Sequence, residues 1–283
     1  MAVAVQRTGT RNEIAMPPAA TPLPTALVTG ASSGIGEALA RNLAEAGHDL
    51  VLVARREAKL AELARALAAA HGTRVDVVAT DLARDGAAAA LAASLRRRRR
   101  VVDVLVNNAG VLEQGAFVTL RASAHQRVID LNVSGLTAML AAFVPAMVAR
   151  GHGRVLNVAS ISAFAPVPGL ATYAASKAYV LALSETLAEE LRGTGVTVTA
   201  LCPGITATAM FDRAARGNAR VARLPGLLVG DVEAVAAEGL RACLAGEVVA
   251  VPGALNQAVA MAGRVTPRQW LRRVAGALGR RML

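Results

Sequence analysis

Short, unbroken runs of valine, leucine and other apolar residues alternate along the chain with longer alanine- and leucine-rich stretches. Seven such runs lead into small or polar residues, and they lie within residues 25–30, 49–56, 74–82, 102–110, 153–160, 195–204 and 246–253. Continuous apolar runs are typical of strands that are buried on both faces of a parallel sheet. Strands that alternate with helices require right-handed crossover connections. We therefore predict a single α/β domain with a doubly wound parallel sheet of about seven strands and helices on both faces.

The segments before and after this pattern have a different character. Residues 1–23 contain several prolines and no periodic apolar pattern, so we expect a disordered leader before the domain of residues 24–253. Residues 254–283 form a basic extension. An amphipathic basic helix there can lie on an anionic membrane, pack on its own domain or form an oligomer interface, and packing is the commoner outcome. The apolar residues that fall near one face of this helix are Trp270, Leu271, Val274 and Leu278.

The composition argues against several classes of protein. The chain is 54% hydrophobic, but it has no run of about 18 to 20 uninterrupted apolar residues, so we predict no transmembrane segment. The net charge of +11 comes almost wholly from arginine, yet only 2% of the residues are aromatic, which makes a nucleic-acid partner the weaker interpretation. Cys202 and Cys243 offer neither a disulfide framework nor metal-ligand spacing, so we expect no metal and a cytoplasmic location.

A run of five arginines, Arg96 to Arg100, precedes one of the predicted strands. It falls at the end of a predicted helix, where cations interact favourably with the helix dipole. Charge runs are usually solvated, so we interpret this run as a solvated helix end, with a partner site as the alternative.

A glycine-rich turn joins the first predicted strand to the helix that follows it. Glycines allow the backbone to turn tightly and to approach a pyrophosphate, while the helix N-terminus offers N–H groups to the phosphates. The position of the turn, between strand and helix at the start of the domain, predicts a dinucleotide site. The residues of the turn are Thr29, Gly30, Ala31, Ser32, Ser33, Gly34, Ile35 and Gly36.

The end of the second strand carries two arginines, Arg55 and Arg56. An acidic residue at this place would bind the ribose 2′-hydroxyl of NAD, whereas an arginine accommodates the 2′-phosphate of NADP. A guanidinium can grip a phosphate with two parallel hydrogen bonds. We therefore predict NADP(H) as the cofactor in preference to NAD(H), although both arginines could simply be surface residues at the start of the next helix.

Tyr173 and Lys177 are spaced to lie on one face of a helix, one turn apart. A neighbouring ammonium favours the phenolate, so we expect it to lower the tyrosine pKa towards a useful range for proton transfer. Ser160, at the end of a strand, could hydrogen-bond the same substrate oxygen. Each residue alone has an ordinary structural explanation, but their order and placement together predict a catalytic site.

These motifs together make the chain resemble the short-chain dehydrogenase/reductase family, in its single-domain form with a Rossmann-like fold. The resemblance covers about Thr25 to Gly253. One difference is Ser33, where many NADP-dependent members have a basic residue, so that binding of the 2′-phosphate would depend more on Arg55, with Arg56. The matching motifs are the glycine-rich turn, Asp81-Leu82, Asn107-Asn108-Ala109-Gly110, Asn132, Ser160, Tyr173 with Lys177, and Pro203-Gly204 with Thr208.

The resemblance implies roles for these residues. Asn132, Ser160, Tyr173 and Lys177 would form a catalytic tetrad, in which the lysine also holds the nicotinamide ribose and the asparagine anchors a water molecule. The adenine side would be formed by Asp81, Leu82, Asn108, Ala109 and Gly110. The nicotinamide carboxamide would be approached by Pro203, Gly204, Thr206 and Thr208. Members of the family commonly form homodimers or homotetramers.

The expected activity is hydride transfer between NADP(H) and a carbonyl or secondary alcohol of a small molecule. The alternative is a non-catalytic NADP(H)-binding sensor or interaction protein on the same fold, which would not need Tyr173 and Lys177 together. Residues 205–229 should form a variable lid over the substrate. Its arginines, which we interpret as solvated, could otherwise attract an anionic substrate.

Overall fold

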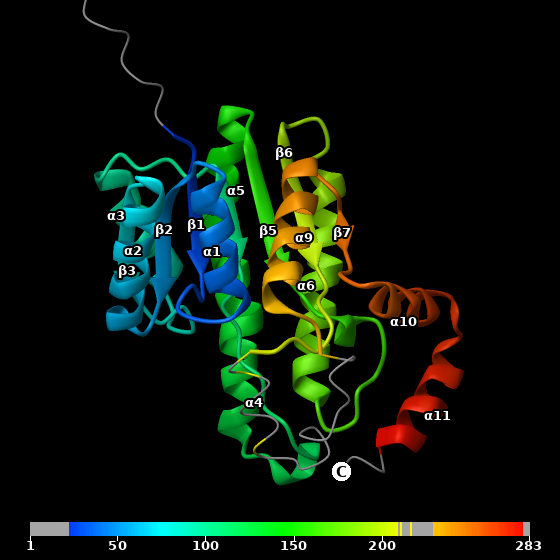
Figure 1. Cartoon of the computed structure of the whole chain (residues 1–283). Coiled ribbons are helices and arrows are strands. Elements are labelled where there is room, and N and C mark those ends of the chain that lie inside the picture. The colour runs from blue at the N-terminus through cyan, green and yellow to red at the C-terminus, as the bar shows by residue number, and fades with distance from the viewer. Residues whose placement is uncertain (1–22, 209, 211–215, 217–228, 280–283) are drawn as a thin grey trace, which may run out of the picture.

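The computed structural model describes residues 23–208, 210, 216 and 229–279, and its centre is a parallel sheet of seven strands (Figure 1). The strands stand in the order β3-β2-β1-β4-β5-β6-β7, so the chain winds outwards from β1 in two directions. This arrangement confirms the predicted doubly wound sheet. The leader predicted for residues 1–23 lies outside the described residues apart from Leu23. The strands are β1 Thr25–Thr29, β2 Asp49–Ala54, β3 Val75–Ala79, β4 Val104–Asn107, β5 Gly153–Val158, β6 Val196–Leu201 and β7 Val249–Ala250.

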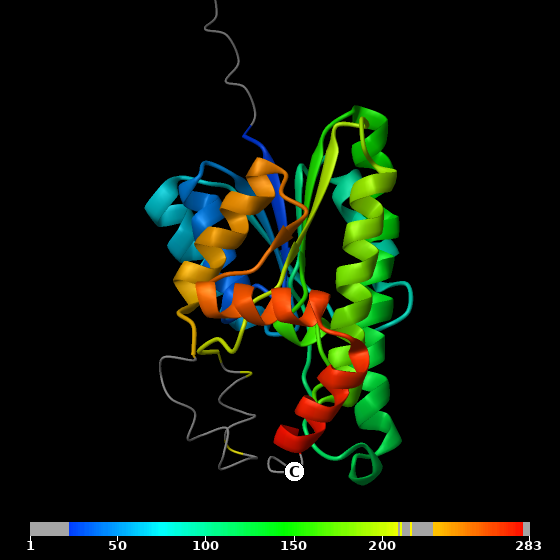
Figure 2. The same ribbon diagram turned by 90° about the vertical axis from the view of Figure 1, so that its right-hand side faces the viewer.

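Helices cover both faces of the sheet, and Figure 2 shows the sheet between the two helical layers. On one face α1, α2 and α9 bury their leucines and alanines against the strands, and on the other face α3, α5 and α6 do the same. The central strands are buried on both faces, as their continuous apolar runs predict. These helices are α1 Ile35–Glu45, α2 Glu57–His71, α3 Ala87–Arg97, α5 Leu136–Arg150, α6 Ala171–Glu190 and α9 Val232–Ala245.

A single long helical stretch, residues 122–150, is formed from three parts. The helix α4, Ala122–Ile129, runs through a π-helical segment, Asp130–Gly135, into α5. Within the described residues this stretch is the one helix long and apolar enough to cross a membrane, judged by length and composition alone. Six apolar side chains of α5 are buried in the core, which accounts for its composition: Leu136, Met139, Leu140, Phe143, Val144 and Met147.

The arginine run at the end of α3 is only partly solvated. Arg96 and Arg97 are exposed in the last turn of the helix, as predicted. Arg100 is different, because its side chain is only 9% exposed and pairs with Asp49 at 2.9 Å and with Asp76 at 2.8 Å. The interpretation of the whole run as a solvated helix end is therefore wrong for Arg100, which joins the starts of β2 and β3.

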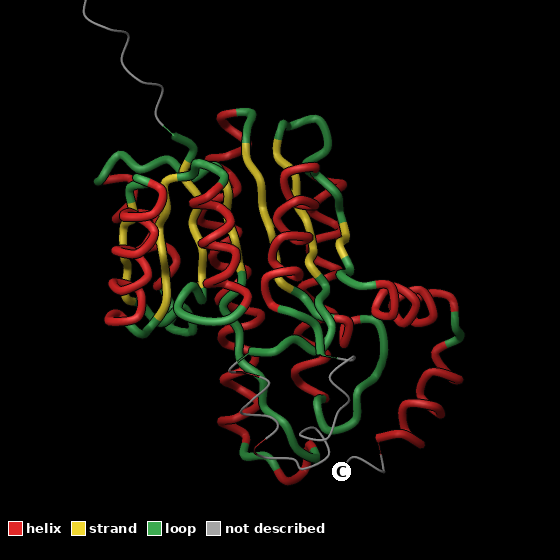
Figure 3. Tube along the Cα trace, viewed as in Figure 1, coloured by secondary structure: helices red, strands yellow, loops and turns green. Residues whose placement is uncertain are grey.

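Two 3-10 turns and two further helices lie at the end of the molecule where the strands have their carboxyl ends, as the arrows in Figure 1 show; Figure 3 shows the same end with helices in red and loops in green. From β7 the chain passes into α10, which crosses below the sheet, and then into α11 (Figure 2). These elements are the 3-10 turns η1 Phe117–Thr119 and η3 Ile161–Ala163, and the helices α10 Ala254–Val265 and α11 Arg268–Gly279.

Candidate active site

The glycine-rich turn leaves an open backbone surface at the start of α1. Gly30 has a φ of 66°, and a Cβ there would lie 2.7 Å from Nδ2 of Asn108. A Cβ at Gly36 would lie 2.6 Å from the carbonyl oxygen of Gly30. Gly34 caps α1 without a side-chain hydrogen bond to the helix. The turn therefore excludes side chains at its closest approaches and presents the N-terminus of α1, which is the arrangement that suits a bound pyrophosphate.

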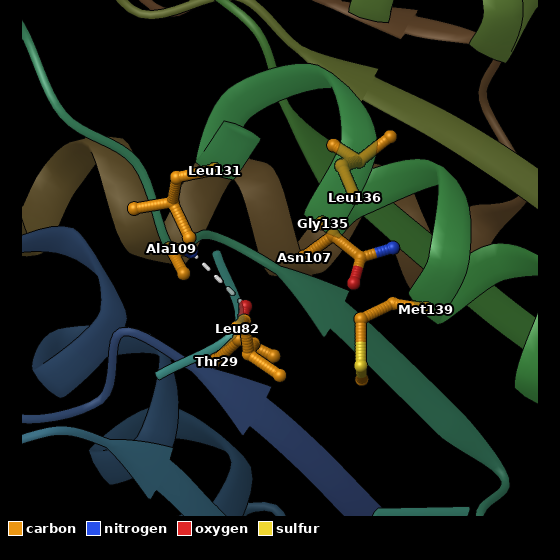
Figure 4. A pocket seen from close by; sticks show the side chains of 8 residues that line it. All are labelled: Thr29, Leu82, Asn107, Ala109, Leu131, Gly135, Leu136 and Met139. Atoms are coloured by element: carbon orange, nitrogen blue, oxygen red, sulfur yellow. Dashed lines mark hydrogen bonds between the residues drawn. The ribbon is translucent and has the colours of Figure 1, made fainter. Parts of the chain in front are cut away.

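Thr29 and Asn108 connect this turn to the loop after β4. The Thr29 hydroxyl donates to the carbonyl oxygen of Val106 and accepts from the backbone N–H groups of Asn108 and Ala109, at 2.9 and 3.0 Å. Figure 4 shows the bond between Thr29 and Ala109, which both line a small, mainly apolar pocket together with Met139. The Asn108 side-chain amide donates in turn to the carbonyl oxygen of Thr29 at 2.9 Å. The two side chains therefore fix the glycine-rich turn and the loop after β4 relative to each other.

Arg55 and Arg56 follow β2, and their side chains make different contacts. Arg56 reaches back to the glycine-rich turn, where its guanidinium donates to the Ser32 and Ser33 hydroxyls at 2.9 and 2.8 Å. Arg55 has a side chain that is 68% exposed, and its guanidinium lies 4.0 Å from the Asp81 carboxylate. Arg56 is therefore engaged in shaping the turn, while the guanidinium of Arg55 is accessible to a ligand.

The segment after β6 meets the glycine-rich turn. A Cβ at Gly34 would lie 3.0 Å from Cγ2 of Thr208, so these two parts of the predicted cofactor site are neighbours. Thr206 is buried and donates its hydroxyl hydrogen to the carbonyl oxygen of Gly204 at 3.1 Å. Gly204 in turn packs against Asn256 of α10. Most of the predicted lid, residues 205–229, lies outside the described residues.

Ser160 and Tyr173 form a pair at the carboxyl end of β5. The Ser160 hydroxyl accepts a hydrogen bond from the Ser162 N–H at 3.1 Å and also bonds to the Tyr173 side chain. Burial raises the pKa of Tyr173 to about 12, and the Ser160 hydrogen bond opposes this rise. The expectation that the neighbouring lysine brings the tyrosine pKa down is therefore wrong, because desolvation of the phenolate is the larger effect.

Lys177 lies one turn further along α6. Its ammonium donates to the carbonyl oxygen of Val158 at 2.8 Å and lies 5.7 Å from the centre of the Tyr173 ring. Burial lowers the pKa of Lys177 to about 8. Nζ also lies near Gly110, since a Cβ there would be 3.6 Å away. The loop after β4, the end of β5 and the helix α6 thus converge on this ammonium group.

Asn132 occupies the π-helical segment and is almost fully buried. The side-chain oxygen of Asn132 accepts a hydrogen bond from the Val111 N–H at 2.9 Å. The side-chain NH2 group donates to the Val111 carbonyl oxygen, also at 2.9 Å. The amide also donates to the Ser176 hydroxyl at 3.1 Å. Asn132 thereby ties the loop after β4 to α6 next to Lys177. Such π-helical segments occur often at functional sites.

His125 makes contacts beside Tyr173 that the sequence analysis did not predict. His125 of α4 bonds through Nδ1 to the Thr172 hydroxyl at 2.7 Å and through Nε2 to the Phe117 carbonyl oxygen at 3.1 Å. Its ring also stacks on Phe117 at 4.3 Å. Because Thr172 precedes Tyr173, His125 joins the loop before α4 to the start of α6. A lone histidine in a helix carries no sequence signal for such a contact.

Three comparisons describe what the chain is similar to. The short chain dehydrogenase family matches residues 24–219. The oxidoreductase UcpA of Escherichia coli is 35% identical over 193 residues, which are 68% of this chain and 73% of UcpA. A short-chain dehydrogenase from Sphingobium yanoikuyae, solved in complex with NADPH, is 38% identical with a TM-score of 0.77, and the match covers 89% of this chain and 96% of that one.

A second solved structure is an alcohol dehydrogenase from Comamonas testosteroni, described as specific for bulky-bulky ketones. It is 32% identical with a TM-score of 0.72, and the match covers 92% of this chain and 94% of that one. The family match spans more than half of the chain and includes the glycine-rich turn, Ser160, Tyr173 and Lys177. The protein belongs to the short-chain dehydrogenase family of oxidoreductases.

Proposed function

We propose that this protein is an NADP(H)-dependent oxidoreductase that interconverts a carbonyl group and a secondary alcohol in a small molecule, with Tyr173 as general acid and base. The observation that carries the proposal is the convergence of Ser160, Tyr173, Lys177 and Asn132 at the sheet edge that also carries the glycine-rich turn. In doubly wound sheets, ligands bind at this edge.

The residues of the turn fit a dinucleotide. Gly30 and Gly36 leave no room for side chains, α1 presents its N-terminus, and Arg55 is accessible for the 2′-phosphate. NADPH, the group found with the Sphingobium dehydrogenase, would supply the hydride when bound. Among the other predicted contacts, Asp81, Leu82, Ala109 and Gly110 would lie along the adenosine side, and Pro203, Gly204, Thr206 and Thr208 along the nicotinamide side.

Side chains of the protein would supply the proton that the carbonyl oxygen takes up during reduction. Tyr173 is protonated at neutral pH because its pKa is about 12. The phenol can therefore give its proton to a carbonyl oxygen as that oxygen gains negative charge. The Ser160 hydroxyl, which already accepts from the Ser162 N–H, can donate to the same oxygen. The Lys177 ammonium then stabilises the phenolate that remains.

The direct test is to measure NADPH consumption with a panel of ketones and aldehydes, and to identify the alcohols formed. The bulky-ketone specificity described for the Comamonas enzyme makes large ketones a sensible part of the panel. Carbonyl-dependent consumption with formation of the matching alcohol supports the proposal. The non-catalytic alternative predicts NADPH binding without consumption for every compound in the panel.

The pH dependence of carbonyl reduction should follow the ionisation of the Lys177 side chain. Its pKa of about 8 means that the ammonium group is lost as the pH rises through that value, and with it the charge that stabilises the phenolate. Tyr173 stays protonated over this range, so it does not limit the reaction. We expect kcat/KM for reduction to be constant below pH 8 and to fall above it, as measured from initial rates over a pH series. An unchanged kcat/KM through this region would contradict the role given to Lys177.

The two arginines after β2 should differ in their effect on cofactor choice. Because Arg55 is accessible and Arg56 is held by the turn, Arg55→Ala should weaken NADPH binding about ten- to hundredfold, the effect of losing a charged hydrogen-bonding partner, and change NADH binding little. Arg56→Ala should loosen the turn and weaken both cofactors alike. Titration of each variant by calorimetry gives the two affinities.

The exposed Arg65 on α2 provides a matched control, because Arg65→Ala removes the same charge away from the turn. Its affinities for both cofactors should equal those of the wild type. An equal loss of NADPH and NADH affinity in Arg55→Ala would show that Arg55 does not select the cofactor.

A further inference from the structure

The end of the chain is uniformly basic. Glu247 is the last acidic residue in the sequence, and every charged residue after it is an arginine. A segment with this composition is attracted to anionic surfaces, because it carries arginines and no acidic side chain of its own. The six arginines are Arg264, Arg268, Arg272, Arg273, Arg280 and Arg281.

The helix α10 is fixed to the body of the protein. Arg264 pairs with Glu185 of α6 at 2.9 Å, and its guanidinium lies over the Phe164 ring at 5.3 Å. Gly263 packs so closely on Phe164 that an added Cβ would be 2.8 Å from the Cβ of that residue. From this attachment α11 extends along the carboxyl end of the sheet, clear of the two helical layers (Figures 1 and 2).

The helix α11 is amphipathic, but part of its apolar side faces solvent. Trp270 is 60% exposed and Val274 is 58% exposed, and they lie one turn apart on the same face. Arg272 and Arg273 are exposed as well, and the Arg273 guanidinium lies 5.8 Å from the centre of the Trp270 ring. A tryptophan and aliphatic residues beside arginines are typical of helices that lie in a membrane interface.

Further apolar side chains are exposed on α10 and elsewhere at this end of the molecule. Met261 and Val265, in the second half of α10, are 60% and 71% exposed. Phe117 and Val118 are 61% and 89% exposed, and their segment before α4 lies at the same end of the molecule as α11 (Figures 1 and 2). Exposed apolar side chains that gather at one end of a protein commonly mark an interaction site.

We infer that α11, together with the end of α10, is a docking surface for an anionic lipid membrane. The arginines fit anionic headgroups, and Trp270 and Val274 fit the boundary between headgroups and acyl chains. A second copy of this chain suits the surface less well. A symmetric interface formed by α11 would bring together two helices that carry arginines and no acidic side chain, and like charges repel each other.

Trp270 is the only tryptophan in the chain, so its fluorescence reports directly on this surface. The experiment mixes the full-length protein with vesicles of phosphatidylcholine alone, or of phosphatidylcholine with phosphatidylglycerol. It measures the emission maximum of Trp270 and the fraction of protein that sediments with the vesicles. We expect a shift to shorter wavelength and co-sedimentation with the anionic vesicles, much less with the neutral ones, and a loss of both at high salt.

Charge-reversal variants locate the surface. Arg272→Glu/Arg273→Glu should lower the affinity for anionic vesicles about tenfold or more, since each basic residue near the membrane contributes to binding. Arg96→Glu/Arg97→Glu makes the same change in net charge at exposed positions at the end of α3. This control should bind as the wild type does. Thermal unfolding of all three proteins verifies that each is folded.

Three results would overturn the inference. The first is a wild-type protein that gives neither a shift nor co-sedimentation with the anionic vesicles. The second is an equal loss of affinity in the two double variants, which would mean that net charge alone drives binding. The third is an unchanged vesicle affinity in Arg272→Glu/Arg273→Glu with a change in molecular mass by light scattering, which would assign the surface to a second copy of the chain.

Discussion

Tyr173→Phe should lower kcat for carbonyl reduction by about two to four orders of magnitude, which is the usual contribution of a positioned general acid. The variant loses only the hydroxyl that bonds to Ser160. The ring stays on α6, with the Lys177 ammonium group over it. NADPH affinity should therefore change by no more than a few-fold. Steady-state kinetics with the best carbonyl from the panel, together with a binding titration of NADPH, measure the two effects separately.

Tyr179→Phe provides the matched control for this variant. Tyr179 is the other tyrosine of the chain and lies on the same helix, where its hydroxyl bonds to that of Thr137 at 2.8 Å on the surface. Its loss should leave kcat unchanged. If Tyr173→Phe and Tyr179→Phe turned over carbonyl compounds equally well, the assignment of Tyr173 as the proton donor would be refuted.

Arg100→Ala should lower the free energy of unfolding by about 3 kcal/mol or more, the usual result of leaving buried charges without a partner. The side chain is 9% exposed, and its removal would leave Asp49 and Asp76, both 16% exposed, without their closest cation. Arg74 and Arg98 lie 3.9 Å from Asp76 and would offset a part of the loss. Urea unfolding curves for the variant and the wild type give the difference directly.

The control for Arg100→Ala lies within the same arginine run. Arg97 is exposed at the end of α3, so Arg97→Ala should change the free energy of unfolding by less than about 0.5 kcal/mol. Similar small losses in the two variants would show that the buried pair contributes little to stability.

Elements with a strong local signal were predictable from the sequence. The helix α2, Glu57–His71, lies in the alanine- and leucine-rich stretch between the second and third apolar runs, and Gly72 follows it in the left-handed conformation that commonly terminates helices. The strands were predictable because their apolar runs are continuous and lead into polar residues at the carboxyl edge. Ser160, Tyr173 and Lys177 had a local signal of their own, since Ser160 follows a strand and the other two are spaced one turn apart on a helix. Asn132 was expected only from the family resemblance.

Contacts between distant segments were not predictable in this way. The partners of Arg100 lie 24 and 51 residues away, so nothing near it in the sequence distinguishes it from Arg97. Arg56 differs from Arg55 only because its side chain turns towards Ser32 and Ser33. The pKa of Tyr173 depends on how much water the folded chain removes from its hydroxyl, and burial of that kind follows from the packing of several elements at once.

The π-helical segment between α4 and α5 limits where this protein can change in length. A π turn holds more residues than an α turn, so the extra residue is accommodated there while α4 and α5 keep their rotation about the common axis. Deleting one residue there would close the wider turn and change which side chain of the segment faces the loop after β4. Asn132 would then lose its hydrogen bonds to Val111 and Ser176, although the apolar face of α5 could stay against the core. Insertions and deletions should therefore be tolerated in surface loops of this chain and rejected within residues 130–135.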